Sequence, residues 1–241
     1  MTNKTLFQKS AKLFLLLAAL IWGSSFVIMK NTIDHLPTFY LLSIRFLTAG
    51  ILLSLVFLKR WKQLKKEYLW RGFLMGVFLF LAYVSQTYGL EGTTPSVNAF
   101  LTTIYCVIVP FLNWIVVKER PSGYHFAAAL MSVGGVGLVS LSGPLNGFLS
   151  VKPGDLLTLL SGFFFAAHMV AVAKFSRGRD IFLLTILQFL YAGILSLLCG
   201  LLWNRFPVHL EMPTVWGIVY LSVCATAAAL LFQNIGQKYT E

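Results

Sequence analysis

The feature that most constrains this chain is a series of continuous apolar runs, each about twenty residues long. Helices of that length cross the ~30 Å hydrocarbon core of a bilayer, at ~1.5 Å per residue. A transmembrane barrel would instead alternate apolar and polar residues over segments of about ten. We therefore predict an all-α integral membrane protein with spans at about 11–30, 37–58, 70–90, 95–117, 122–142, 154–174, 180–202 and 213–236.

The composition excludes a soluble domain. Hydrophobic residues make up 58% of the chain and charged residues 11%, whereas soluble domains contain about 25% charged residues. The net charge of +11 would suit nucleic acid, but the basic residues lie in the short links between apolar runs. That placement is typical of membrane orientation and contact with anionic lipid. We expect the lipid bilayer as a partner and no nucleic acid.

The lysines and arginines also predict the orientation of the chain. With a cytoplasmic N-terminus, fifteen of them fall in inside segments, three outside (Lys30, Lys152 and Arg205) and one, Arg45, within a span. Cytoplasmic loops of membrane proteins carry such an excess. The prediction is a multi-pass protein of the cell (cytoplasmic) membrane with its N-terminus in the cytoplasm.

Two segments of the chain recur. The sequence Phe-Leu-Thr-Ala-Gly-Ile-Leu at 46–52 returns at 189–195 as Phe-Leu-Tyr-Ala-Gly-Ile-Leu, and Gln-Thr-Tyr-Gly at 86–89 returns at 233–236 as Gln-Asn-Ile-Gly. The first half holds an odd number of spans, five, so the second half must enter the membrane in the opposite direction. Inverted repeats of this kind are common in secondary transporters, with the substrate site near the midplane.

Several short motifs resemble the EamA repeat of the drug/metabolite transporter superfamily. They are Trp22-Gly23-Ser24-Ser25-Phe26, Ile44-Arg45-Phe46, Pro110 followed by Lys118-Glu119-Arg120, and Gly134-Gly135-Val136-Gly137. The resemblance implies ten helices in two five-helix repeats, and export of a small metabolite such as an amino acid, a nucleoside or a drug-like solute. On this basis 1–142 is a first EamA repeat of five helices. Residues 153–241 are then a truncated second repeat of three, so that eight of the expected ten helices are present.

Polar and aromatic residues inside the spans are the candidates for a substrate cavity. Asn98, Thr102 and Tyr105 are spaced to share one face of a continuous helix. Packing and hydrogen bonding between helices remain open as the alternative role for each candidate. The full set is Trp22, Ser25, Arg45, Tyr83, Gln86, Asn98, Thr102, Tyr105, His168 and Gln188.

Two of these candidates are ionisable. A charged arginine inside a membrane costs about 2.5–3.5 kcal/mol even on the lenient insertion scale, so Arg45 is a candidate to bind an anionic group of the solute; snorkelling or bracing of a helix is the alternative. Its partners are expected among helix carbonyls, water, the solute and side chains such as Gln86 or Asn98. His168 is a candidate for proton coupling, against a neutral histidine bonded to a carbonyl.

The remaining chemistry is sparse. Every carboxylate falls in a link or at a helix end, no phosphate-binding loop is present, and Cys106, Cys199 and Cys224 lie in apolar runs without metal-ligand spacing. We expect no metal or cofactor, no enzyme activity, and transport by facilitated diffusion or exchange. The expected partner is a small-molecule solute, and a homodimer stays open. The alternatives are a non-transporting helical subunit or inactive fragment and, less favoured, a membrane-embedded enzyme.

Overall fold

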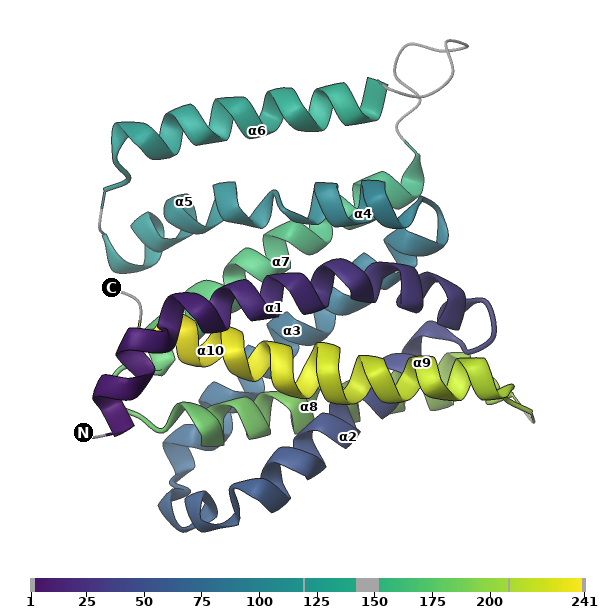
Figure 1. Cartoon of the computed structure of the whole chain (residues 1–241), viewed down its shortest axis with the longest axis horizontal. Helices are drawn as coiled ribbons and strands as arrows, with labels where there is room; N and C mark the ends of the chain where they lie inside the picture. The colour runs from purple at the N-terminus through teal and green to yellow at the C-terminus, as the bar shows by residue number, and fades with distance from the viewer. Residues whose placement is uncertain (1–2, 119, 142–151, 208, 240–241) are drawn as a thin grey trace. The chain divides into compact units, whose positions relative to one another are not determined.

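A computed structural model describes residues 3–118, 120–141, 152–207 and 209–239 (Figure 1). Glu119, residue 142 and Glu241, which enter the sequence analysis, lie outside these ranges. The described residues form helices and contain no strand. These are α1 (Asn3–Ile33), α2 (Thr38–Val56), the 3₁₀ helix η1 (Leu58–Gln63), α3 (Lys66–Glu91), α4 (Pro95–Thr102), α5 (Tyr105–Val117), α6 (Gly123–Leu141), α7 (Pro153–Phe175), α8 (Ile181–Trp203), α9 (Met212–Ser222), the π-helix η2 (Val223–Ala228) and α10 (Ala229–Tyr239).

The predicted all-α membrane class is confirmed. Within the described residues, seven helical segments are long and apolar enough to cross a membrane. Two of them combine several elements: Pro95–Val117 contains α4 and α5, and Met212–Tyr239 contains α9, η2 and α10. The remaining predicted span, 122–142, corresponds to the 19-residue helix α6, Gly123–Leu141.

The predicted span at 95–117 is confirmed with the same bounds, but it is not one regular helix. Helix α4 ends at Thr102, and four backbone bonds that follow span three residues instead of four, for example Ile104 N to Leu101 O at 3.2 Å. The Thr103 hydroxyl donates to Phe100 O at 2.6 Å, which competes with helical bonding at that turn. The backbone of Gly162 in α7 lies against this break, because a Cβ there would meet Thr102 O at 3.4 Å.

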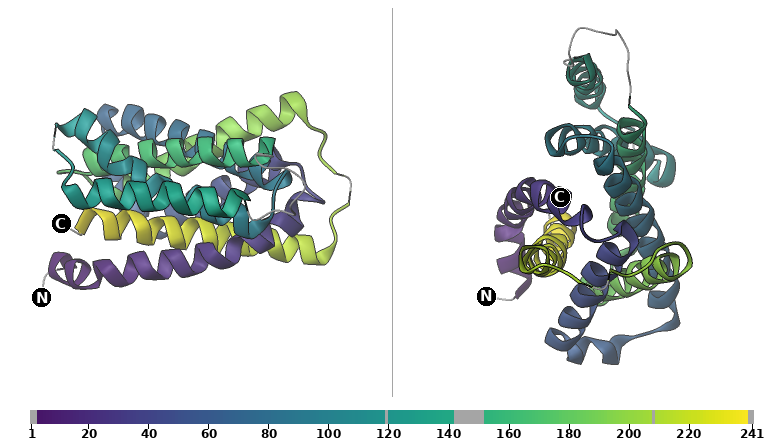
Figure 2. Two further views of the ribbon diagram at one scale, coloured as in Figure 1. Left: turned by 90° about the horizontal axis from the view of Figure 1, so that it is seen from above. Right: turned by 90° about the vertical axis from the view of Figure 1, so that its right-hand side faces the viewer.

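The described chain divides into two compact units. Unit 1 is Met1–Phe80 with Ala171–Glu241, and unit 2 is Leu81–Val170. In unit 1, α1 lies beside α9 and α10 and runs in the opposite direction (Figure 1). The start of α1 and the end of α10 therefore lie at the same end of that unit (Figure 2).

The recurring segment at 46–52 and 189–195 lies at the contact between α2 and α8 in unit 1. A Cβ on Gly50 would meet the Leu190 side chain at 2.8 Å, and one on Gly193 would meet the Leu47 side chain at 2.8 Å. Phe46 and Phe189 stack with their centroids 6.1 Å apart. Each contact has its counterpart at a separation of 143 residues. A two-fold relation between the two helices produces this reciprocity.

A second pair of contacts repeats within the separate units. In unit 2, Gly89 of α3 approaches α7, where its Cβ would meet Gly154 O at 2.8 Å and the Thr158 side chain. In unit 1, Gly236 of α10 approaches α1, where its Cβ would meet Ala11 O at 2.9 Å and the Leu15 side chain at 2.7 Å. Gly154 and Thr158 follow Ala11 and Leu15 by the same 143 residues. The repeat seen in sequence is therefore a repeat of packing.

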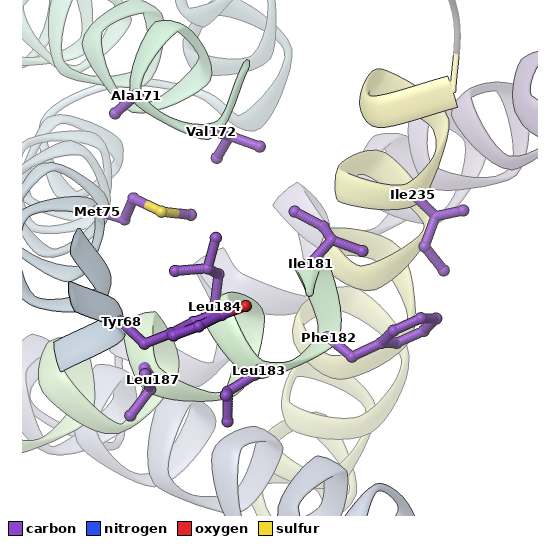
Figure 3. Close-up of a cluster of buried hydrophobic side chains, with 10 residues drawn as sticks. All are labelled: Tyr68, Met75, Ala171, Val172, Ile181, Phe182, Leu183, Leu184, Leu187 and Ile235. Carbon is purple, nitrogen blue, oxygen red and sulfur yellow. The ribbon is translucent and has the colours of Figure 1, made fainter. Parts of the chain in front are cut away.

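Unit 1 contains an apolar core that lies next to a group of ion pairs. Ten buried side chains from α3, α7, α8 and α10 form the core cluster (Figure 3). Next to it, Asp180 caps α8 by accepting from Leu183 N at 3.0 Å and pairs with Arg60 at 2.6 Å. Glu67 pairs with Arg71 and Arg179. These charges belong to segments that the sequence predicts to be cytoplasmic.

Candidate substrate-binding site

Arg45 is buried in unit 1. It is seven residues into α2, and only 1% of its surface is exposed. Its Nε donates to Thr226 Oγ1 at 3.1 Å, and its Nη1 lies 3.2 Å from the Met29 sulfur. Both of these partners are neutral. Burying a charge in a protein interior is expensive, so an arginine that is 1% exposed is unusual for a helix core.

Thr226, which accepts the hydrogen bond from Arg45, lies in the π-helix η2. The sequence analysis did not predict this π-helix. The wider turn is visible in the bond from Ala229 N back to Cys224 O, five residues earlier, and the Thr226 hydroxyl donates to Leu221 O, also five residues back, at 2.7 Å. Single π turns inside α-helices occur frequently at functional sites. Nothing in the Ala-rich run around Thr226 indicates such a turn.

Trp22 contacts the same turn from α1. Its indole Nε1 donates to Ala225 O at 3.0 Å, so Trp22 and Arg45 bind neighbouring residues of η2. Ser25 is buried one helical turn along α1 and donates to Trp22 O at 2.8 Å. The structure therefore brings Trp22 and Arg45 together at η2, with Ser25 bonded to Trp22 O. The sequence could indicate that these residues matter but not that Trp22 and Arg45 meet there.

Gln188 occupies in α8 the place that Arg45 occupies in α2. The two residues are 143 positions apart, each directly before one of the stacked phenylalanines, Phe46 and Phe189. Gln188 is fully buried. The repeat therefore places a long polar side chain at equivalent positions of α2 and α8, charged in one half and neutral in the other.

Unit 2 contains a network of amide and hydroxyl groups that joins three helices. The Asn98 amide of α4 donates to Gln86 O of α3 at 3.1 Å and to Thr158 Oγ1 of α7 at 2.7 Å. Gln86 Nε2 donates to Thr102 Oγ1 at 3.1 Å. Among the described residues, the buried Asn98 Oδ1 has no hydrogen-bond partner. Of the network, Thr158 was missed by the sequence analysis, although it is polar and lies inside a predicted span.

The predicted shared face of Asn98, Thr102 and Tyr105 is interrupted. Because the helix breaks at residues 103 and 104, Tyr105 begins a separate helix, α5. It contacts Phe165, whose ring also meets Tyr83, with centroids 6.3 and 5.2 Å apart. Tyr105 is thus part of an aromatic group in unit 2 and not of the polar stripe expected from helical spacing.

The ten candidates fall into two separate groups. Trp22, Ser25, Arg45 and Gln188 belong to unit 1, and Tyr83, Gln86, Asn98, Thr102, Tyr105 and His168 to unit 2. His168 is buried in α7. Arg45 was expected to bond with partners such as Gln86 or Asn98, whereas the described bonds link it to Thr226 and Met29 of its own unit. Among the described residues, no group of three or more histidine, cysteine or acidic side chains is placed to hold a metal ion.

Several membrane-spanning helices, an internal repeat and buried polar side chains are together typical of membrane transport proteins. Comparison with known proteins identifies the family. The EamA-like transporter family matches residues 9–141 and 152–241, and the chain belongs to this family.

Individual relatives agree with this assignment. An uncharacterized transporter of Archaeoglobus fulgidus is 32% identical over 96% of this chain and 70% of its own length. A Salmonella typhimurium protein named a probable amino-acid metabolite efflux pump is 26% identical over 88% of this chain and 72% of its own length. A crystal structure with 21% sequence identity has the same fold, with a TM-score of 0.73 over 97% of this chain and 80% of that one.

Proposed function

We propose that this protein is a secondary transporter that carries a small metabolite with a carboxylate group, such as an amino acid, across the cytoplasmic membrane by alternating access. The N-terminus lies in the cytoplasm in this proposal. The observation that carries the proposal is Arg45, a guanidinium that is 1% exposed inside a helical bundle and bonded to the neutral Thr226 hydroxyl and Met29 sulfur.

The chemistry of arginine supports a carboxylate as the solute group. Guanidinium and carboxylate form two parallel, charge-assisted hydrogen bonds, which are roughly twice as strong as bonds between neutral groups. A solute carboxylate that displaced Thr226 Oγ1 and Met29 Sδ would exchange neutral acceptors for such a pair. The name of the Salmonella typhimurium relative refers to amino-acid metabolites, which carry this group.

The position of Thr226 supports a coupling between binding and movement. Because Thr226 belongs to η2, its bond to Arg45 ties α2 to the π turn in the α9–α10 span. Solute binding at Arg45 would release that tie and shift the balance between two helix arrangements. A ligand shifts such a balance only through a difference in its contacts between the two states. The carboxylate supplies that difference.

The test is exchange of labelled amino acids in vesicles that contain the purified protein. Wild-type protein should exchange internal unlabelled solute for external labelled solute, and the solute should emerge chemically unchanged. Arg45→Lys keeps the charge but loses the planar fork, and we expect it to reduce exchange of carboxylate solutes by about tenfold or more, a loss of ~1.4 kcal/mol in binding.

Arg205→Lys, at an exposed arginine of the link before α9, is the matched control and should exchange as wild type does. Equal exchange by Arg45→Lys and wild type would overturn the carboxylate assignment. Failure of every tested solute to saturate would overturn the transport function, and a modified product would favour an enzyme.

A further inference from the structure

A groove of about 380 Å³ lies in unit 1 between the last turns of α1 and the start of α9. Ile28 and Thr32 share one face of α1, and His35 lies in the turn that follows the helix, where its backbone N donates to Thr32 O at 3.2 Å. On the α9 side, Gly217 lets the two backbones approach, because a Cβ there would meet Thr32 Oγ1 at 2.7 Å. The groove therefore has a close-packed floor. Its volume lies in the range of small-molecule sites.

The walls of the groove combine aromatic rings with a carboxylate. Trp216 and Tyr220 lie four residues apart on α9, and Glu211 directly precedes that helix. Trp216 is 69% exposed. Lysine and arginine are absent from the residues that line the groove, although the chain as a whole has a net charge of +11. The local balance of charge is thus opposite to that of the whole chain.

Aromatic faces attract cations through their quadrupole, and tryptophan does so best. A carboxylate at the rim adds a direct charge attraction. Substituted ammonium groups fit both features, since their weakly hydrated surface can lie against the rings while the charge faces Glu211. The carboxylate at this rim would repel anions. Neutral apolar molecules would gain no charge attraction from the carboxylate.

The two segments that line the groove also carry bonds of the site around η2. The Tyr220 hydroxyl lies 2.6 Å from Ser24 Oγ and bonds α9 to α1 there. Beyond this contact come Ala225, which accepts from Trp22, and Thr226, which accepts from Arg45. In sequence order, the bond between Tyr220 and Ser24 lies between the rest of the groove and the bonds at η2 on both segments.

We propose that the groove lined by Glu211, Trp216, Tyr220 and His35 is a binding site for substituted ammonium groups. The proposal rests on the transport function for its role in solute selection, but binding to the groove can be measured without transport. A solute that bears both an ammonium and a carboxylate group would have one group suited to the groove and one suited to the arginine.

The test uses the purified full chain in lipid nanodiscs, with labelled choline as the cation and 3,3-dimethylbutan-1-ol as its neutral isostere. Choline should bind saturably, its binding should weaken as salt rises, and the neutral alcohol should not compete. Glu211→Gln and Trp216→Leu should each weaken choline binding by about tenfold.

The controls change matched residues that do not line the groove. Asp34→Asn removes an exposed carboxylate near the end of α1, and Trp203→Leu removes an exposed tryptophan at the end of α8. Both should bind choline as wild type does. Trp216→Phe retains an aromatic face and should bind better than Trp216→Leu, and thermal unfolding of each variant reports whether it is folded.

The proposal is wrong if the neutral alcohol competes as well as choline does, or if folded Glu211→Gln binds choline as wild type does. This outcome is independent of the transport assay. Amino-acid exchange without choline binding would leave the transport function standing and remove only the groove proposal. Choline binding without exchange of any solute would do the reverse.

Discussion

Thr226 has two roles at the residue scale. Its hydroxyl donates to Leu221 O and accepts from Arg45 Nε, so one side chain both closes the π turn and provides an acceptor for a buried charge. Leaving a buried charged donor without its acceptor costs more than an ordinary hydrogen bond contributes, about 1–3 kcal/mol or above. Thr226 should therefore matter for stability more than a threonine in an alanine-rich run suggests.

Thr226→Val keeps the shape of the side chain and removes both hydrogen bonds. We expect it to destabilise the protein by about 1–3 kcal/mol, which lowers the melting temperature in detergent by several degrees. Thr226→Ser retains the hydroxyl and is the matched control, with a melting temperature near that of wild type. Equal melting temperatures for Thr226→Val and the wild-type protein would mean that the hydroxyl does not stabilise the buried arginine.

At the scale of elements, glycines decide how closely the helices approach. Gly72 and Gly76 of α3 lie against Leu187 and Tyr191 of α8, and Gly50 and Gly193 form the reciprocal contact between α2 and α8. Small residues are used in this way in membranes because lipid supplies no hydrophobic force between helices, which leaves close van der Waals packing to hold them. Adding a methyl group at such a contact forces apart two helices that carry Arg45 and Gln188.

The two reciprocal glycines should differ in their sensitivity to alanine. At Gly193 the added Cβ would meet the backbone nitrogen of Leu47 at 2.9 Å, whereas at Gly50 the backbone nitrogen of Leu190 is 3.3 Å away and the nearest atom is the end of the leucine side chain. Backbone atoms cannot move aside as a side chain can. Gly193→Ala should therefore lower the melting temperature more than Gly50→Ala does.

A double-mutant cycle extends this comparison. Leu190→Ala should partly rescue Gly50→Ala, and Leu47→Ala should rescue Gly193→Ala less, because the backbone clash remains. Gly23→Ala in α1 is the control, since nothing lies within 4 Å of a Cβ at that position. Equal effects at Gly23 and Gly193 would show that the α2–α8 contact does not limit stability.

At the scale of the whole chain, the membrane orientation is a prediction from the charges that a labelling experiment can decide. Fifteen of the 19 lysines and arginines lie in segments predicted to be inside, and cytoplasmic loops retain such residues. The segments with the ion pairs of Arg60, Glu67 and Asp180 would then face the cytoplasm, and the groove with Glu211 and Trp216 would face outward.

Single cysteines introduced into a variant without Cys106, Cys199 and Cys224 test the orientation. A membrane-impermeant maleimide applied to intact cells should label a cysteine at His209 and should not label one at Lys62 or Lys238. After the cells are permeabilised, all three positions should react. Labelling at Lys62 in intact cells would reverse the predicted orientation and would place the groove at the cytoplasmic face.

The sequence alone predicts those properties of the structure that are local. The apolar runs establish membrane helices because a bilayer demands about twenty apolar residues whatever their partners are. The recurring segments established the internal repeat, and Arg45 stood out because a charge within a span is costly on its own. Each of these inferences needs only neighbouring residues or a comparison of one segment with another.

The tertiary structure decided what depends on contacts between distant segments. The π turn at Val223–Ala228, the break after Thr102 and the bond from Arg45 to Thr226, 181 residues away, leave no periodic signal in the sequence. The backbone at these points accepts an irregular turn because Trp22 satisfies a carbonyl at one and Gly162 leaves room at the other. The sequence therefore determined which residues enter the membrane and which of them are costly there, and packing alone decided which of those residues meet.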